Sequence, residues 1–135
     1  MTIANLEVLL RSMSPEYRRG EFVFVDGSAL PPEVAVEASV REREGLSAII
    51  ARADADRLGL RYDFVGAWIT LAVLSSLDSV GLTAAVSSEL SKLGIPCNVV
   101  AGLHHDHLIV AADRADDALT ALRRLTGRPS RPARR

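Results

Sequence analysis

The sequence predicts a small α+β protein in which an antiparallel sheet carries helices on one face. One stretch, residues 67–112, leads to this prediction. Its apolar pattern changes from a strand to a helix and then to two further strands, and a second amphipathic helix follows. Two helices in the order βαββα pack on the same face of a small sheet, which is a ferredoxin-like arrangement.

The apolar run 67–74 predicts a central strand, because the residues on both of its faces are suited to burial. A polar break at 75–79 follows. The next segment repeats apolar residues at steps of three and four, at Leu82, Val86, Leu90 and Leu93. That spacing is typical of an amphipathic helix, and Gly94 predicts its end.

Two strands are expected after this helix, over 95–101 and 107–112, with a polar turn between them. Asp113 is expected to cap the last helix with its carboxylate. The apolar stripe of that helix ends at Leu125, and Gly127 closes it.

The N-terminal half predicts the order αβββα. The expected elements are a helix over 2–13 that Pro15 cannot continue, a strand over 22–25, a hairpin of 34–40 with 46–50, a helix over 53–58 that Gly59 ends, and a link over 61–66. Both halves share helix, hairpin and helix, which indicates an internal duplication, although the strand 22–25 has no counterpart placed in the same way. We expect halves at 1–62 and 63–125, followed by a disordered Arg-rich tail at 126–135.

Three motifs of the C-terminal half resemble the ACT domain. They are VGLTAAV at 80–86, GIPCNVVAG at 94–102 and HHDH at 104–107. The chain is similar to a small bacterial family with two tandem ACT-like halves, which is distantly related to the ACT modules of aspartate kinases and to the arginine sensors of the TOR pathway. The resemblance implies tandem ferredoxin-like units with a binding role, and the family has no assigned activity.

The resemblance implies that an effector binds between the loop 75–82 and the strand that follows the helix. The matching positions are Ser76, Leu77, Asp78, Val80, Gly81, Leu82, Asn98 and Val99. Amides at a helix N-terminus favour an anion, so an amino acid would place its carboxylate there, and Asp78 or a neighbouring backbone carbonyl would pair with its ammonium. The alternative is structural: Asp78 or Ser79 caps the helix, and Asn98 holds a loop.

All three histidines lie within the segment His104–His107. We expect His104 or His105 to line the ligand pocket, which would make binding sensitive to pH. A weak alternative is a metal site that uses His105 and His107, which share one side of an extended chain, although a metal needs three or four convergent ligands. A third interpretation is a polar hairpin turn.

No catalytic residue and no cofactor are expected. Ser75 and Ser76 lack the glycine-flanked turn that exposes a nucleophilic serine. Cys97 alternates in phase with Ile95 and Val99, so we expect a buried, unreactive thiol.

The composition, with 48% hydrophobic and 24% charged residues among 135, is that of a soluble globular protein. The net charge is −1, and removing the four arginines of 128–135 leaves −5 on residues 1–127, so no basic surface for nucleic acid is expected. One cysteine, no leader and no apolar run of membrane-spanning length predict a cytoplasmic protein without membrane contact.

The expected function is that of a non-catalytic sensor that binds a small ligand, an amino acid, and shifts between two arrangements of its ACT units. A homodimer is expected because the open edges of the sheet need cover. Two alternatives stay open: a structural or protein-interaction module without a ligand, and a metal-responsive protein that uses the histidine cluster.

Overall fold

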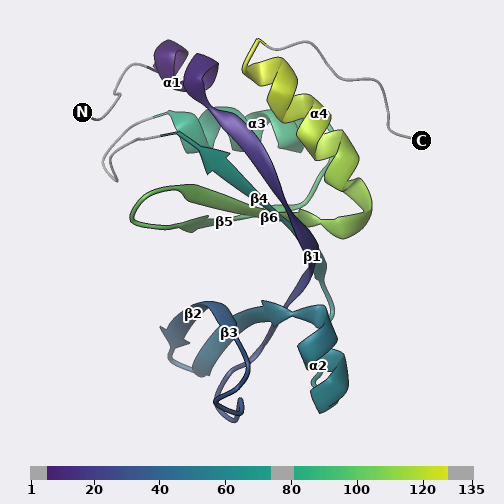
Figure 1. Ribbon diagram of the computed structural model, residues 1–135. Coiled ribbons are helices and arrows are strands. Elements are labelled where there is room, and N and C mark those ends of the chain that lie inside the picture. The colour runs from purple at the N-terminus through teal and green to yellow at the C-terminus, as the bar shows by residue number, and fades with distance from the viewer. Residues whose placement is uncertain (1–5, 74–80, 128–135) are drawn as a thin grey trace.

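The computed structural model describes residues 6–73 and 81–127 (Figure 1). Its elements are α1 (Leu6–Ser12), β1 (Ser14–Asp26), β2 (Val36–Glu42), β3 (Gly45–Ala51), α2 (Arg52–Leu58), β4 (Val65–Ala72), α3 (Leu82–Lys92), β5 (Cys97–Ala101), β6 (Asp106–Ala111), the 3-10 turn η1 (Ala112–Arg114) and α4 (Ala115–Leu125). The strands form one six-stranded sheet in the order β2-β3-β1-β4-β6-β5, and every neighbouring pair is antiparallel. The predicted α+β class and antiparallel sheet are confirmed.

β1 and β4 are the two central strands, and each takes part in both halves of the molecule. The first part of β1, Ser14–Arg18, pairs with β4, and its second part, Phe22–Asp26, pairs with β3. The register shifts between Arg18 and Phe22. In Figure 1, β1 runs from the upper group of elements, beside α3 and α4, down to the hairpin β2–β3. The two halves therefore form one continuous sheet.

The sheet order makes the two halves equivalent. The C-terminal unit has the order β1-β4-β6-β5, and the N-terminal unit has the order β4-β1-β3-β2. β1 and β4 thus correspond, and so do the hairpins that follow them. This corrects the expectation that the strand at Phe22–Val25 lacks a counterpart. The segment 27–35 of the N-terminal unit occupies the position that α3 occupies in the C-terminal unit, and the structure assigns no helix to it.

Side chains alternate between a face that the helices cover and a helix-free face. The largest core cluster lies between the sheet and the helices α1, α3 and α4. The sheet contributes Ile69 and Leu108 to it, and the helices contribute Leu9 and Leu122, among others. A second cluster, which includes Val23 and Ile50, packs beside α2. The helix-free face carries its own small cluster, Phe22, Ile49, Trp68 and Ile109.

Several predicted boundaries differ from the structure. β1 begins at Ser14 and not at Phe22. The sequence missed its first part because residues 16–21 are exposed, with charged side chains on both faces, and therefore show no apolar alternation. Asp113 lies inside η1, and Arg114 precedes α4 without a side-chain cap, so the predicted Asp113 cap is wrong. Cys97 begins β5, is partly buried against the main core, and its burial raises the pKa of the thiol.

Gly66 in β4 lies where the two units meet. A Cβ added there would stand 2.3 Å from Cγ2 of Ile109 and 3.2 Å from Cε2 of Phe64. Phe22, opposite Gly66 on β1, belongs to the same helix-free cluster as Ile109. A residue without a side chain is therefore required for this close packing.

We predict that Gly66→Ala lowers the free energy of unfolding by about 1–3 kcal/mol, because the new methyl group overpacks against Ile109. Denaturant unfolding measures the change. Leucine has no methyl group on Cβ, so the double variant Gly66→Ala/Ile109→Leu should lose less stability than the sum of the two single variants. A Gly66→Ala protein as stable as the wild type would contradict this packing.

Candidate functional site

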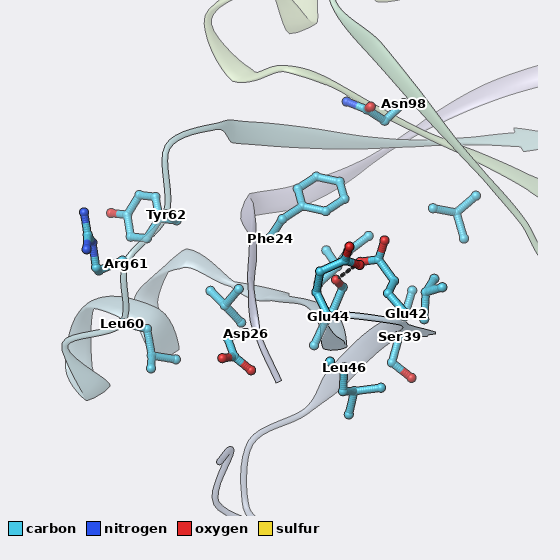
Figure 2. A pocket seen from close by; sticks show the side chains of 18 of the residues that line it. Phe24, Asp26, Ser39, Glu42, Glu44, Leu46, Leu60, Arg61, Tyr62 and Asn98 are labelled. Atoms are coloured by element: carbon cyan, nitrogen blue, oxygen red, sulfur yellow. Dashed lines mark hydrogen bonds between the residues drawn. The ribbon is translucent and has the colours of Figure 1, made fainter. Parts of the chain in front are cut away.

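A cleft of about 970 Å³ opens on the helix-free face between the two units (Figure 2). The N-terminal unit supplies most of its lining from three segments: the end of β1, the hairpin β2–β3, and residues 60–63. The C-terminal unit supplies Asn98, Val99 and Val100 of β5. The cleft thus depends on β5 being carried over the face of the other unit by the shared strands β1 and β4.

The floor of the cleft is apolar. Phe24 of β1, Ala38 and Val40 of β2, and Ile49 of β3 lie on the same side of the sheet, because paired residues of neighbouring strands share a face. Phe24 is 37% exposed and Val40 is 61% exposed. Large apolar side chains that remain exposed inside a cavity are typical of a ligand site.

Carboxylates surround this apolar floor. The cleft is lined by Asp26, Glu42, Glu44 and Asp63, against a single cation, Arg61. No ion pair joins any of these four carboxylates to a cation within the described part of the chain. Figure 2 shows the side chains of Glu42 and Glu44 directed from the hairpin toward the side where Asn98 lies. The cleft therefore holds unneutralised negative charge.

Two serines hold two of these four carboxylates, Asp26 and Glu42, in place. The backbone N–H and the hydroxyl of Ser28 donate to Oδ1 of Asp26 at 3.0 and 2.7 Å, and these hydrogen bonds lower the pKa of Asp26. The hydroxyl of Ser47 donates to Oε1 of Glu42, the bond drawn in Figure 2. Asp26 is therefore ionised at neutral pH, and Glu42 has a fixed orientation.

The wall formed by residues 60–63 is fixed through Tyr62. Nε of Arg52 donates to the Tyr62 hydroxyl at 2.9 Å, and that hydroxyl donates to Oδ1 of Asp56 at 2.6 Å. Arg52 also donates to Glu21 at 2.9 Å, and the hydrogen bonds to Tyr62 and Glu21 raise the pKa of its guanidinium. This network ties the wall to α2 and β1.

The structure places four of the predicted ligand residues in two different surroundings. Asn98 and Val99 line the cleft, and Asn98 pairs with Ile109 of the helix-free cluster. Gly81 and Leu82 lie at the start of α3 on the helix-covered face: Leu82 is buried, and the side chain of Leu6 approaches Gly81. The remaining predicted positions, Ser76, Leu77, Asp78 and Val80, fall outside the described residues.

His104 and His105 precede β6, His107 is its second residue, and none of the three lines the cleft. His104 is exposed, and His105 is partly buried, with an Nδ1 that has no hydrogen-bond partner among the described residues. Residues 6–73 and 81–127 contain no group of three or more His, Cys, Asp or Glu side chains that could hold a metal ion. His105 and His107 therefore lack a third ligand in the described structure.

His107 belongs instead to a network on the helix-free face. Nε1–H of Trp68 donates to Nδ1 of His107 at 3.2 Å, and Oγ1 of Thr70 lies 2.9 Å from the same nitrogen. An indole N–H can only donate, so Nδ1 of His107 accepts and the imidazole is neutral with its proton on Nε2. Burial and the charges of His105 and Arg18 lower the pKa of His107, whereas Asp106 raises it.

Arg18 joins this network to the wall of the cleft. Its guanidinium lies 5.0 Å from the ring centre of Phe22 and 5.3 Å from that of Trp68, and its Nη1 contacts Oε1 of Glu37 at 2.8 Å. Glu37 is on β2, next to Ala38 of the cleft floor. Arg18 therefore connects the central strand β1 to the edge strand β2, which contributes to the cleft floor.

Sequence reasoning missed most of the cleft. Glu42 ends β2, Glu44 stands in the hairpin turn, and Arg61 and Asp63 stand in a link, all places where charged residues are ordinary. No spacing in the sequence joins them to Asn98. The pairing of β1 with both β3 and β4 is what brings these segments together.

The fold and the cleft define a class: a pair of ferredoxin-like units that share one sheet and enclose a cavity of ligand size between them. Models of the ACT domain match residues 2–67 and 64–124. The chain belongs to the ACT-domain family, as two ACT domains in tandem.

Solved structures share this fold over most of the chain. A Vibrio cholerae protein of unknown function, described as a possible transport protein, is 39% identical, with a TM-score of 0.80 over 90% of this chain and 95% of its own. A protein from Agrobacterium tumefaciens is 20% identical, with a TM-score of 0.68 over 84% of this chain and 89% of its own. The ligand-free regulatory subunit of aspartate kinase from Thermus thermophilus is 9% identical, with a TM-score of 0.60 over 84% and 98% of the two chains.

A search of curated proteins found no match. None of the described helices has the length and apolar character needed to cross a membrane.

We predict that His107 makes stability depend on pH. Its pKa in the folded protein is below the ordinary value near 6.5, so the unfolded chain takes up this proton first as the pH falls. Stability present above about pH 6.5 is therefore lost as the pH falls toward the lowered pKa. Urea unfolding between about pH 7.5 and 5 measures the effect.

In His107→Asn, the amide oxygen can still accept from Trp68 but does not titrate, so this part of the pH dependence should disappear. His104→Asn, at an exposed position, is the matched control and should retain the wild-type profile. Equal profiles for the wild type and His107→Asn would show that this assignment is wrong.

Proposed function

We propose that this protein is a non-catalytic regulatory sensor whose ligand is an amino acid, bound in the cleft between its two ACT units. One observation carries the proposal: the cleft takes its carboxylates and apolar floor from the N-terminal unit and Asn98 from the C-terminal unit. A ligand that contacts both walls favours the arrangement in which they are close, and this shift in population is the signal.

The chemistry of the lining suits an amino acid. The α-ammonium would pair with Glu42 or Glu44, and the α-carboxylate would accept hydrogen bonds from the Asn98 amide or the Arg61 guanidinium. The apolar part of the side chain would lie on Phe24. The cavity of about 970 Å³ falls in the size range of small-molecule sites.

Two features support a role without catalysis. The described residues that line the cleft include no histidine and no cysteine, the usual proton shuttle and the strongest nucleophile. The chain also belongs to a family whose domains serve as regulatory modules, and the Thermus thermophilus neighbour is itself a regulatory subunit. A response would then be read by a partner protein or by self-association.

The proposal includes three further expectations. The halves divide near residues 62 and 63, with β1 and β4 shared between them. A homodimer covers β2 and β5, the edge strands of the sheet, whose outer backbone groups have no neighbour within the described sheet. The protein works in the cytoplasm, where the single Cys97 remains reduced. Ligand-binding roles also stay predictions for the other expected positions, namely Ser76, Leu77, Asp78, Val80, Gly81, Leu82, His104 and His105.

A thermal-shift screen of the twenty amino acids identifies the ligand, and titration calorimetry then measures its affinity. We predict that Asn98→Ala or Glu44→Gln weakens binding about tenfold, because each removes one hydrogen bond to a charged group. Glu33→Gln, in the exposed loop before β2, is the matched control and should bind as the wild type does. Unchanged affinity in both cleft variants, or a loss in His104→Ala alone, would move the site away from the cleft.

A further inference from the structure

The cleft is larger and more negative than a single amino acid requires. At about 30 Å³ per water, its volume of about 970 Å³ corresponds to roughly thirty waters, whereas an amino acid has about ten non-hydrogen atoms. Four carboxylates against Arg61 leave a net charge of −3 on the lining. A small zwitterion neutralises none of this net charge, so the cleft also has the room and the charge for a longer, cationic occupant.

The chain itself contains a segment with the complementary charge. Residues 128–135, which follow α4 and lie outside the described structure, read RPSRPARR. The segment carries four arginines and no acidic side chain, whereas residues 1–127 carry −5. Its two prolines restrict the backbone, which reduces the entropy lost when an extended segment binds.

We propose that the cleft docks the Arg-rich segment 128–135 of this chain, and that the docked segment competes with the small ligand. Guanidinium groups make paired hydrogen bonds with carboxylates, and one hairpin supplies two of them to the cleft, Glu42 at the end of β2 and Glu44 in the turn that follows. A guanidinium also stacks on aromatic rings, and Phe24 offers a partly exposed ring on the floor of the same cleft.

The proposal that the segment competes with the ligand rests on the proposed function. The proposal that the segment docks in the cleft does not. A docked segment would occupy the carboxylates that the α-ammonium needs, so the resting protein would be partly self-inhibited. A ligand, or an acidic partner that captures the arginines, would release the segment. Ligand binding in the cleft would thereby free the segment 128–135, which other molecules could then contact.

The test uses the full chain with all four arginines replaced, Arg128→Gln/Arg131→Gln/Arg134→Gln/Arg135→Gln, and a fluorescent peptide of residues 126–135. Fluorescence anisotropy measures binding of the peptide to the emptied cleft. We expect saturable binding that weakens with salt, and weaker apparent binding to the wild type, whose own segment competes. Because the peptide is supplied in solution, recognition is tested whether the segment reaches the cleft of its own copy or that of a neighbour.

The carboxylates locate the binding site. Adding Glu42→Gln/Glu44→Gln to the arginine-free chain should weaken peptide binding about tenfold. The matched control, Glu33→Gln/Asp116→Asn, removes the same charge from exposed positions outside the cleft and should change binding less than twofold. Absence of saturable binding, or an equal loss in the control, would overturn the docking proposal.

Amino-acid affinity, measured in parallel on the wild type and on the arginine-free chain, separates the two proposals. Tighter binding to the arginine-free chain, by about threefold or more, is expected from competition. Amino-acid binding without peptide binding overturns the inference and leaves the proposed function standing. Peptide binding without any amino-acid ligand overturns the proposed function and leaves docking standing.

Discussion

The pairing of β1 with β4 is the constraint on which the rest of this structure depends. Each strand is central to the sheet and completes the unit that the other begins, so neither half has its full set of strands alone. Gly66 allows the two units to pack closely at this point because it has no side chain. The same pairing carries β5 over the N-terminal hairpin and so creates the cleft.

The helix-free face divides into two regions of opposite character. Near Trp68, Arg18 forms an ion pair with Glu37 and contacts two aromatic rings, and the hydrogen bond from Trp68 keeps His107 neutral. The polar groups of this region are therefore paired with one another. Around Phe24, serine hydroxyls orient two of the four carboxylates, Asp26 and Glu42, and none of the four has a cation paired with it in the described residues. The first region holds β2 against the sheet, and the second leaves negative charge unpaired within the described residues. A structural region and the region of the proposed ligand site therefore lie beside each other on one surface.

The strongly periodic elements could be predicted from the sequence. The run 67–74 and the spacing from Leu82 to Leu93 gave β4 and α3 because burial imposes a period on apolar residues. The first part of β1 could not be predicted, since charged residues lie exposed on both of its faces and no apolar alternation marks the strand. Asn98 was found through the resemblance to the ACT domain. The carboxylates at Glu42 and Glu44 carry no local signal, because only the long-range pairing of strands places them opposite β5.

The central claim is that one ligand bridges residues of both ACT units. Amide chemical-shift mapping of the full chain, titrated with the amino acid that stabilises it, tests this most directly. The account predicts that shifts appear together at Asn98–Val100 of β5 and at Glu42–Leu46 of the hairpin, with the same dissociation constant. Shifts confined to Gly81–Leu82 and His104–His105, with the hairpin unchanged, would contradict it.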